Sequence, residues 1–137
     1  MAEIANGMQV ASTACMTQPQ RQDLNARAFR LAAQVFKMYP RFAASGSGHA
    51  FVAKQLLKAV TSIGANLQEG TAPSSRRDMA AKYSIALRES REGNFWARLG
   101  ATDSRWTSEL APIIQETHEF VAMLTVSVTK LRKPPEE

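Results

Sequence analysis

The chain has 137 residues, of which 45% are hydrophobic and 21% are charged, and its formal net charge is +5. This length suits one domain, and the hydrophobic fraction excludes an intrinsically disordered chain. No apolar run is long enough to span a membrane, the segment 8–16 lacks the basic start and apolar centre of a signal peptide, and a single cysteine excludes an intramolecular disulfide. We therefore expect a cytoplasmic protein.

Residues 1–22 show no sustained hydrophobic period and are rich in Ala, Gln, Thr and Ser, which predicts a mobile leader. The first predicted helix runs from Leu24 to Tyr39, with Asp23 as its N-cap. Pro40 is expected to end it, because a residue that precedes proline is disfavoured in the helical region. The apolar face of this helix consists of Leu24, Ala28, Leu31, Val35 and Met38.

A linker over residues 41–48, containing the run Ser-Gly-Ser-Gly, is predicted before the second helix. The second helix is predicted over residues 49–69, because apolar side chains recur there at a helical spacing. Gly70 follows at the place where a left-handed residue commonly caps a helix. The apolar face of this helix consists of Val52, Leu56, Val60, Ile63 and Leu67.

The third helix is predicted to begin with a capping box formed by Ser75 and Asp78, and it reaches Leu99. A fourth helix covers about residues 108–131, with basic side chains near its C-terminal end, where they complement the helix dipole. No strand pattern competes in the sequence. The predicted fold is all-α: an antiparallel, up-down-up-down four-helix bundle over residues 23–133, preceded by the leader 1–22 and followed by a tail, 134–137.

Two rows of side chains on the third helix differ in character. One row places two carboxylates between apolar residues, and the opposite row contains only small residues. The first row is Ile85, Glu89, Glu92, Trp96 and Leu99, and the second is Ala86, Ser90, Gly93, Ala97 and Gly100. We interpret the small row as a surface for the close approach of another helix, and Trp96 and Trp106 as core or interface anchors.

The carboxylates of the third helix favour a structural polar layer, because buried charge is retained only when it is paired and hydrogen-bonded. The layer is predicted to contain Asn66, Glu69, Glu89 and Glu92. Exposed glutamates are the main alternative. A ferritin-like di-metal site is a further one, but such sites use Glu-x-x-His motifs and the chain has none. We predict no metal, no cofactor and no catalytic residue, since even Cys15 has no activating neighbour in the sequence.

The charge is unevenly distributed along the chain. Residues 21–44 contain five Lys or Arg and one acid, residues 71–106 contain seven and four, and residues 107–129 contain three acids and no Lys or Arg. Such asymmetry suits a basic surface for a polyanion or complementary faces within an assembly. A solvated surface that is merely basic is the alternative.

The block from Gln55 to Trp96 resembles a family of bacterial four-helix-bundle proteins first noticed as open reading frames in intervening sequences of large-subunit ribosomal RNA genes. The resemblance covers about residues 24–131. It rests on the segments QL at 55–56, SIGAN at 62–66, EG at 69–70, IALRE at 85–89, RE at 91–92 and FW at 95–96. Gly93 departs from the family, which has a larger residue there, and this glycine is expected to loosen the third helix.

The resemblance implies an assembly and a class of partner. The family is similar to the accessory protein of diversity-generating retroelements, which forms a pentameric barrel of four-helix bundles with a basic surface and works with a reverse transcriptase and nucleic acid. No enzymatic activity is established for the family. For this chain the resemblance implies a homo-oligomer, with five subunits as the suggested number, in which the basic excess is repeated around a ring.

The sequence favours a non-enzymatic protein that binds RNA or structured DNA through phosphate contacts, with weak sequence specificity. The candidate contacts are Arg76, Arg77, Lys82, Arg88, Arg91 and Arg98. A scaffold for a protein partner encoded nearby is the alternative, and an unrecognised enzyme or metal protein is the third hypothesis.

Apolar side chains beside the main stripes predict a closed homo-oligomer, most simply a cyclic one. They are Phe29, Phe36, Phe51 and Leu57. The small row of the third helix is expected to add to this interface. The acidic fourth helix is expected to lie beside basic neighbouring subunits and to offset their mutual repulsion.

Overall fold

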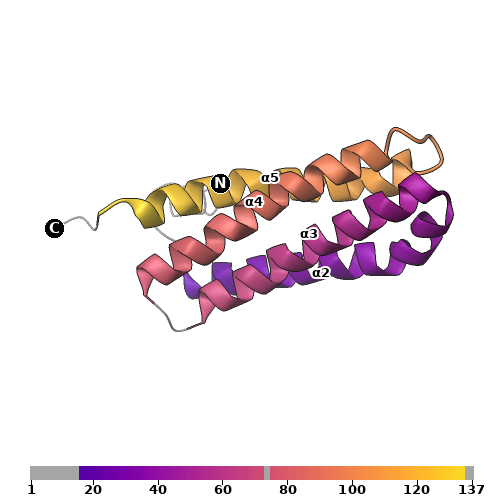
Figure 1. The fold of residues 1–137 in the computed structure, drawn as a ribbon. Coiled ribbons are helices and arrows are strands. Elements are labelled where there is room, and N and C mark those ends of the chain that lie inside the picture. Colours follow the sequence, from indigo (N-terminus) through magenta and orange to yellow (C-terminus); the bar gives the residue numbers. More distant parts are fainter. Residues whose placement is uncertain (1–15, 73–74, 135–137) are drawn as a thin grey trace, which may run out of the picture.

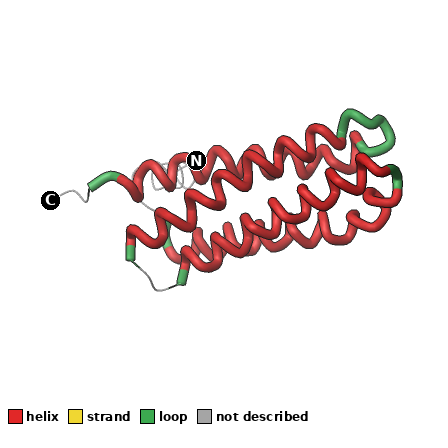
Figure 2. The backbone as a smooth tube through the Cα atoms, in the orientation of Figure 1, coloured by secondary structure: helices red, strands yellow, loops and turns green. Residues whose placement is uncertain are grey.

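The computed structural model describes residues 16–72 and 75–134, and these residues form four helices (Figure 1). They are α2, Gln18–Ala44; α3, Ser47–Thr71; α4, Arg76–Gly100; and α5, Thr107–Arg132. Successive helices run in opposite directions and are joined by short connections (Figure 2). No strand occurs among the described residues, so the predicted all-α four-helix bundle is confirmed. None of these four helices is long and apolar enough to cross a membrane.

Three of the four helices bury the apolar face that the sequence predicts. No residue of the two faces predicted for α2 and α3 is more than 8% exposed. Helix α5 adds Leu110, Ile113, Phe120 and Leu124, which are all completely buried. Helix α4 is the exception, because Ile85 and Trp96 are only partly buried and Leu99 is 44% exposed.

The first helix begins at Gln18, six residues before the predicted start. The Thr17 hydroxyl accepts from the Gln20 backbone N–H at 3.4 Å, and the Thr17 N–H donates to Gln20 Oε1 at 2.7 Å. This reciprocal capping box satisfies two N–H groups that a helix start leaves without helical partners. The prediction of Asp23 as N-cap is therefore wrong, and residues 18–22 belong to α2. Residues 1–15 of the predicted leader lie outside the described residues.

The prediction that Pro40 ends the first helix is also wrong, because α2 continues through Pro40 to Ala44. Proline lacks an N–H, so the Phe36 carbonyl loses its helical partner. Both residues are exposed, and water can bond to that carbonyl. The continued helix buries Phe42 completely, with its ring centroid 5.0 Å from that of Trp106. Only Ser45 and Gly46 then separate α2 from α3, where a longer linker was expected.

Gly70 lies inside α3 and does not have the left-handed conformation predicted for a helix cap, since no glycine among the described residues has a positive φ. Its role is to leave space. A Cβ atom at Gly70 would lie 2.7 Å from Cε1 and 2.8 Å from Cδ1 of Tyr83 on α4. The Tyr83 ring is itself buried, so the close approach of α3 and α4 at this point requires glycine.

The small row of α4 packs inside the bundle. Ala86, Ser90 and Ala97 are completely buried, and a Cβ added at Gly93 would meet Ala59 of α3 at 3.4 Å. The expectation that this row contributes to a subunit interface is therefore wrong, because α3 and α5 of the same chain already cover it. The helix is continuous through Gly93, so the expected loosening is not found either. Its N-terminus is capped as predicted, with the Ser75 hydroxyl accepting from the Asp78 N–H at 3.1 Å.

The seam between α2 and α5 is the sparsest contact between neighbouring helices, and arginines bridge it. Arg27 donates through Nη2 to Glu116 at 2.5 Å and to Glu119 at 3.2 Å, and Arg41 of α2 pairs with Glu109. The carboxylates raise the pKa of the Arg27 guanidinium. All three acids of α5 are thus neutralised by α2 of the same chain. The expectation that they face neighbouring subunits is wrong.

Candidate nucleic-acid interface

Four of the six predicted phosphate contacts lie on one exposed row of α4. The row contains Arg77, Ala81, Ser84, Arg88, Arg91, Phe95 and Arg98. Alternating steps of four and three residues keep these positions on one side of the helix. From Arg77 to Arg98 the row extends about 32 Å at ~1.5 Å per residue. We call this surface the α4 basic row.

The arginines of the α4 basic row have no salt bridge to any carboxylate in the described part of the chain. Arg98 donates through Nε to Asn94 Oδ1 at 2.9 Å, a neutral partner. The Asn94 amide group in turn donates to the Ile114 carbonyl and the Thr117 hydroxyl, each at 3.1 Å, which fixes its orientation. The arginines of the row therefore lack the direct carboxylate pairing of Arg27 and Arg41 on α2, although the charge of Arg88 acts on the neighbouring Glu89.

A basic hollow of about 530 Å³ adjoins the N-terminal end of the row. It is lined by Arg76, Arg77, Ala80, Ala81, Leu131, Arg132 and Lys133. Arg132 of α5 donates through Nη2 to Ser84 Oγ at 2.6 Å, which places its charge beside the row. The α5 terminus therefore extends the cationic surface of α4.

The other two predicted contacts have structural partners. Arg76 donates to the carbonyls of Lys130 at 2.7 Å and Leu131 at 3.2 Å, where it complements the negative end of the α5 dipole. Lys82 pairs with Glu69 of α3 at 2.7 Å, away from the row. The structure thus brings together Arg77, Arg88, Arg91 and Arg98, and assigns Arg76 and Lys82 to contacts within the bundle.

The four residues predicted as a polar layer lie in separate contacts, and no hydrogen bond in the described chain joins any two of them. Asn66 donates to the Ser62 carbonyl of its own helix at 2.8 Å. Glu92 accepts from the Trp96 indole N–H at 3.3 Å, and Glu69 pairs with Lys82. Glu89 is half-buried; burial, and then the charge of Glu92, raise the pKa of its carboxyl. The prediction of a hydrogen-bonded layer does not describe these positions.

Among the residues that the structure describes, no group of three or more His, Cys, Asp or Glu side chains could hold a metal ion. Cys15 lies outside these residues. At the end of the bundle that holds the α4–α5 loop, His49 Nε2 of α3 lies 2.8 Å from Asp103 Oδ2. Arg105 first, and then His49, hold the pKa of the Asp103 carboxyl far below its usual range. These contacts join the start of α3 to the α4–α5 loop.

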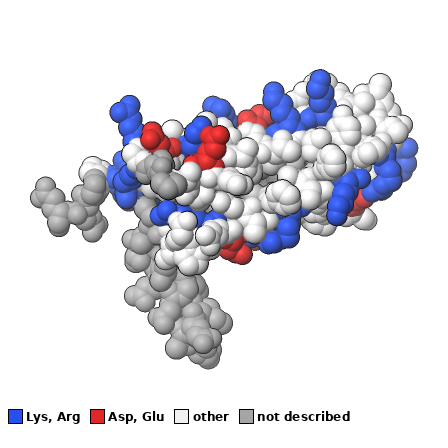
Figure 3. Space-filling model, turned by 90° about the horizontal axis from the view of Figure 1, so that it is seen from below, with Lys and Arg blue, Asp and Glu red and all other residues white. Residues whose placement is uncertain are grey.

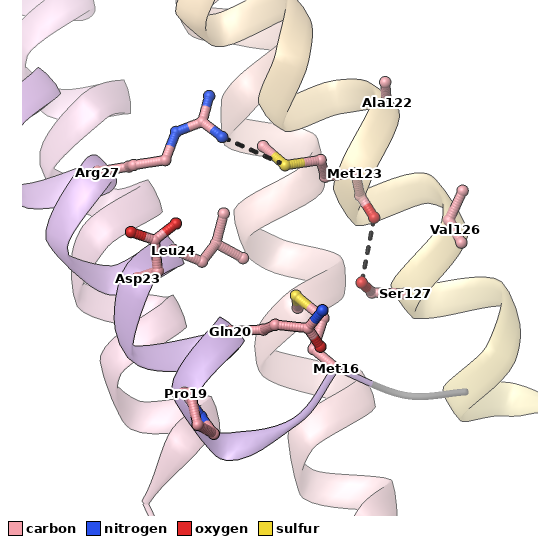
Figure 4. Close-up of a pocket in the computed structure, with 10 residues that line it drawn as sticks. All are labelled: Met16, Pro19, Gln20, Asp23, Leu24, Arg27, Ala122, Met123, Val126 and Ser127. Atoms are coloured by element: carbon pink, nitrogen blue, oxygen red, sulfur yellow. Dashed lines mark hydrogen bonds between the residues drawn. The ribbon is translucent and has the colours of Figure 1, made fainter. Parts of the chain in front are cut away.

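An apolar hollow of about 570 Å³ lies between α2 and α5 (Figure 4). Leu24, Met123 and Val126 are among the residues that line it, and the charged Asp23 and Arg27 lie on the α2 side. Arg27 is already committed to Glu116 and Glu119. This hollow therefore offers no unpaired cation to a polyanion.

Sequence reasoning missed Phe95, Arg132 and Lys133 as parts of the candidate interface. The spacing of Phe95, four residues after Arg91 and three before Arg98, is visible in the sequence and could have placed it on the row. The position of Arg132 could not be derived in this way, because only the packing of α5 against α4 brings it to Ser84.

Comparison with known proteins adds a family and a fold. A family model described as 23S rRNA-intervening sequence protein matches residues 20–126. A crystal structure of a protein of unknown function from the S23 ribosomal protein family of Bacteroides thetaiotaomicron VPI-5482 is similar to the chain, with 26% sequence identity and a TM-score of 0.67. The similarity covers 77% of this chain and 97% of that one. No curated protein matches the chain.

Proposed function

Because the chain belongs to the 23S rRNA-intervening sequence protein family, whose bundle it shares, we propose that it is a non-enzymatic, oligomeric nucleic-acid-binding protein that contacts phosphates. The observation that supports this proposal is the α4 basic row, with four arginines that have no carboxylate partner in the described chain. The acids of α5, which could have balanced them, are paired with α2.

The chemistry of the row predicts weak sequence specificity. Arginines spread over about 32 Å of a straight helix can follow a phosphate backbone, and contacts to phosphate carry little sequence information. Binding releases condensed counterions, so affinity falls steeply as the salt concentration rises. A scaffold for a protein partner remains the second candidate, and the exposed apolar side chains of α2 favour it.

Replacing Arg88 and Arg91 together with glutamine is expected to weaken binding of a labelled, unstructured 20-nucleotide RNA at least tenfold at about 50 mM salt, and to reduce the slope of log K against log salt by about 1.4. Each lost contact to a single strand removes roughly 0.7 from that slope. Fluorescence anisotropy measures both quantities between about 50 and 200 mM salt, with a duplex and a DNA strand as parallel ligands.

The matched control replaces Arg30 and Lys37 with glutamine. Both residues are exposed on α2 and have no salt bridge in the described chain, so the net charge changes equally. The control is expected to alter affinity less than threefold. Equal losses in the two variants, or a flat salt response of the unmodified protein, would contradict a specific role of the α4 basic row.

We further propose that the oligomer forms through an exposed apolar row of α2. The row is Phe29, Ala33, Phe36 and Pro40, with steps of four, three and four residues. Phe29 is 74% and Phe36 66% exposed, values that are unusual for two phenylalanines on one row of a monomer. The face made by α2 and α3 has Lys and Arg mainly along its edges and a largely uncharged middle (Figure 3).

Light scattering coupled to gel filtration is expected to give a mass several times the 15.0 kDa of one chain. Replacing Phe29 and Phe36 with aspartate is expected to reduce it to one chain, whereas aspartate at the exposed Gln34 of α2 and Gln68 of α3 leaves it unchanged. Five subunits are suggested by the resemblance to the retroelement accessory protein. A single-chain mass across micromolar concentrations would refute the oligomer, and a different multiple would refute only the number.

A further inference from the structure

An aromatic side chain interrupts the α4 basic row. Phe95 lies four residues after Arg91 and three before Arg98, and it is 44% exposed. A large apolar ring between arginines presents an aromatic surface beside positive charge, to which a ligand can bind. The mixture of cations and an aromatic ring on one surface is typical of proteins that bind single-stranded nucleic acid.

The Phe95 ring rests on other aromatic residues. Its centroid lies 5.1 Å from that of Trp96, with 34° between the ring planes, and Trp96 meets Phe51 of α3 edge-on at 5.6 Å. The Trp96 indole is held by its hydrogen bond to Glu92. Phe95 therefore presents a ring supported from behind, and little side-chain freedom is lost when a planar ligand binds.

A hollow of about 300 Å³ lies beside this ring and is lined by Phe95, Arg98, Leu99 and Thr102. Arg98 is positioned by Asn94, and the Thr102 hydroxyl donates to the Leu99 carbonyl at 2.7 Å. The hollow thus combines the apolar walls of Phe95 and Leu99 with the guanidinium of Arg98, of which the bond to Asn94 uses only Nε. Such a site suits a planar nucleobase, without preference for one of the four bases.

We infer that a single-stranded nucleic acid lies along the α4 basic row with one unpaired base stacked on Phe95 and neighbouring phosphates on Arg91 and Arg98. This inference rests on the proposed function and adds a preference for single strands. Arg91 and Arg98 are about 10 Å apart along the helix at ~1.5 Å per residue, so they flank the stacked nucleotide. A duplex keeps its bases inside the stack and offers no base face to Phe95.

A second copy of the chain is the competing occupant of this surface. Arg91 and Arg98 flank Phe95 on the row and have no salt bridge in the described chain, and burying them against another protein requires carboxylates to pair with them. The acids of α5 are already paired within the chain, whereas phosphates supply the missing charge directly. The observations therefore favour the nucleic acid.

The test compares Phe95→Leu with Phe95→Tyr, which keeps an aromatic face. At about 100 mM salt, Phe95→Leu is expected to weaken binding of a 20-nucleotide oligouridylate by roughly 5- to 100-fold and to leave a 20-base-pair duplex within twofold. Phe95→Tyr retains the affinity of the unmodified protein. Val126→Ala truncates a similarly exposed apolar side chain in the α2–α5 hollow, outside both proposed interfaces, and is expected to have no effect on either ligand.

A strand with phosphates but no bases isolates the stacking contact. The unmodified protein is expected to bind an abasic 20-mer as weakly as Phe95→Leu binds the complete strand, and Phe95→Leu is expected to lose nothing further. If Arg88→Gln with Arg91→Gln abolishes binding while Phe95→Leu has no effect, stacking is refuted and the proposed function stands. If the unmodified protein binds no nucleic acid, both are refuted. If Phe95→Leu changes the oligomeric mass and leaves the affinity unchanged, Phe95 belongs to a subunit contact and the inference is overturned.

Discussion

Replacing Phe42 with alanine is expected to lower the free energy of unfolding by about 3–5 kcal/mol, as complete truncation of a buried phenylalanine usually does. The ring is completely buried and packs between His49 and Trp106, with centroid distances of 5.3 and 5.0 Å. It joins the end of α2 to the loop before α5. The alanine variant leaves a cavity that rigid neighbours fill only in part.

Chemical denaturation followed by circular dichroism measures this loss, at one fixed protein concentration because self-association shifts apparent stability. Val126→Ala is the control, since it truncates an exposed apolar side chain of α5 that lies outside the proposed subunit contact. The control is expected to change the free energy of unfolding by less than about 0.5 kcal/mol. A small effect at Phe42 would mean that α2 does not hold its helix beyond Pro40 in solution.

Alanine at Gly70 is expected to lower the free energy of unfolding by about 1–3 kcal/mol, because the new methyl group would overlap the buried Tyr83 ring. The same substitution at Gly93 is expected to raise it by about 0.5–1 kcal/mol. There the added Cβ meets Ala59, Thr117 and Val60 at 3.4 to 3.8 Å, which are ordinary contact distances. Both glycines are helical, so the opposite signs report packing and not backbone conformation.

A double-mutant cycle identifies the atoms responsible. Tyr83→Leu removes the ring that a Gly70 methyl group would meet, so the two changes together are expected to cost less than the sum of their separate effects. Strict additivity would mean that the cost of alanine at Gly70 does not come from the Tyr83 ring, and it would contradict the packing explanation. Denaturation midpoints and slopes for all four proteins supply the comparison.

The sequence predicted the number of helices, the buried faces of α2, α3 and α5 and most helix bounds, because those properties depend on a local period. For α4 it did not, since the core side is the row of small residues and not the row of Ile85, Trp96 and Leu99. It failed at Pro40 and at the Ser-Gly linker for a common reason. Local preference opposes a helix at both places, and the burial of Phe42 against residues some sixty positions later outweighs it. No pattern near Pro40 contains that information.

In the candidate interface, too, the sequence predicted what depends on local spacing and missed what depends on packing between helices. The shared row of Arg77, Arg88, Arg91 and Arg98 follows from helical spacing alone. The sequence could not show that Arg76 and Lys82 also have partners within the bundle, namely carbonyls of α5 and a carboxylate of α3. Charge counts also could not show that Arg27 and Arg41 would neutralise α5, because that pairing depends on which helices meet at the seam.

The packing order of the helices has a consequence for how the chain folds. α2 packs mainly on α3, α3 on α4 and α4 on α5, while α2 and α5, the first and last of these helices in the chain, make few contacts with each other. Most native contacts are therefore close in sequence, which gives a low contact order and favours folding in microseconds to milliseconds. A helical hairpin can nucleate without waiting for the ends of the chain to meet. The ionic bridges of the α2–α5 seam, which join the most distant segments, are then formed late and stabilise a bundle whose core is already in place.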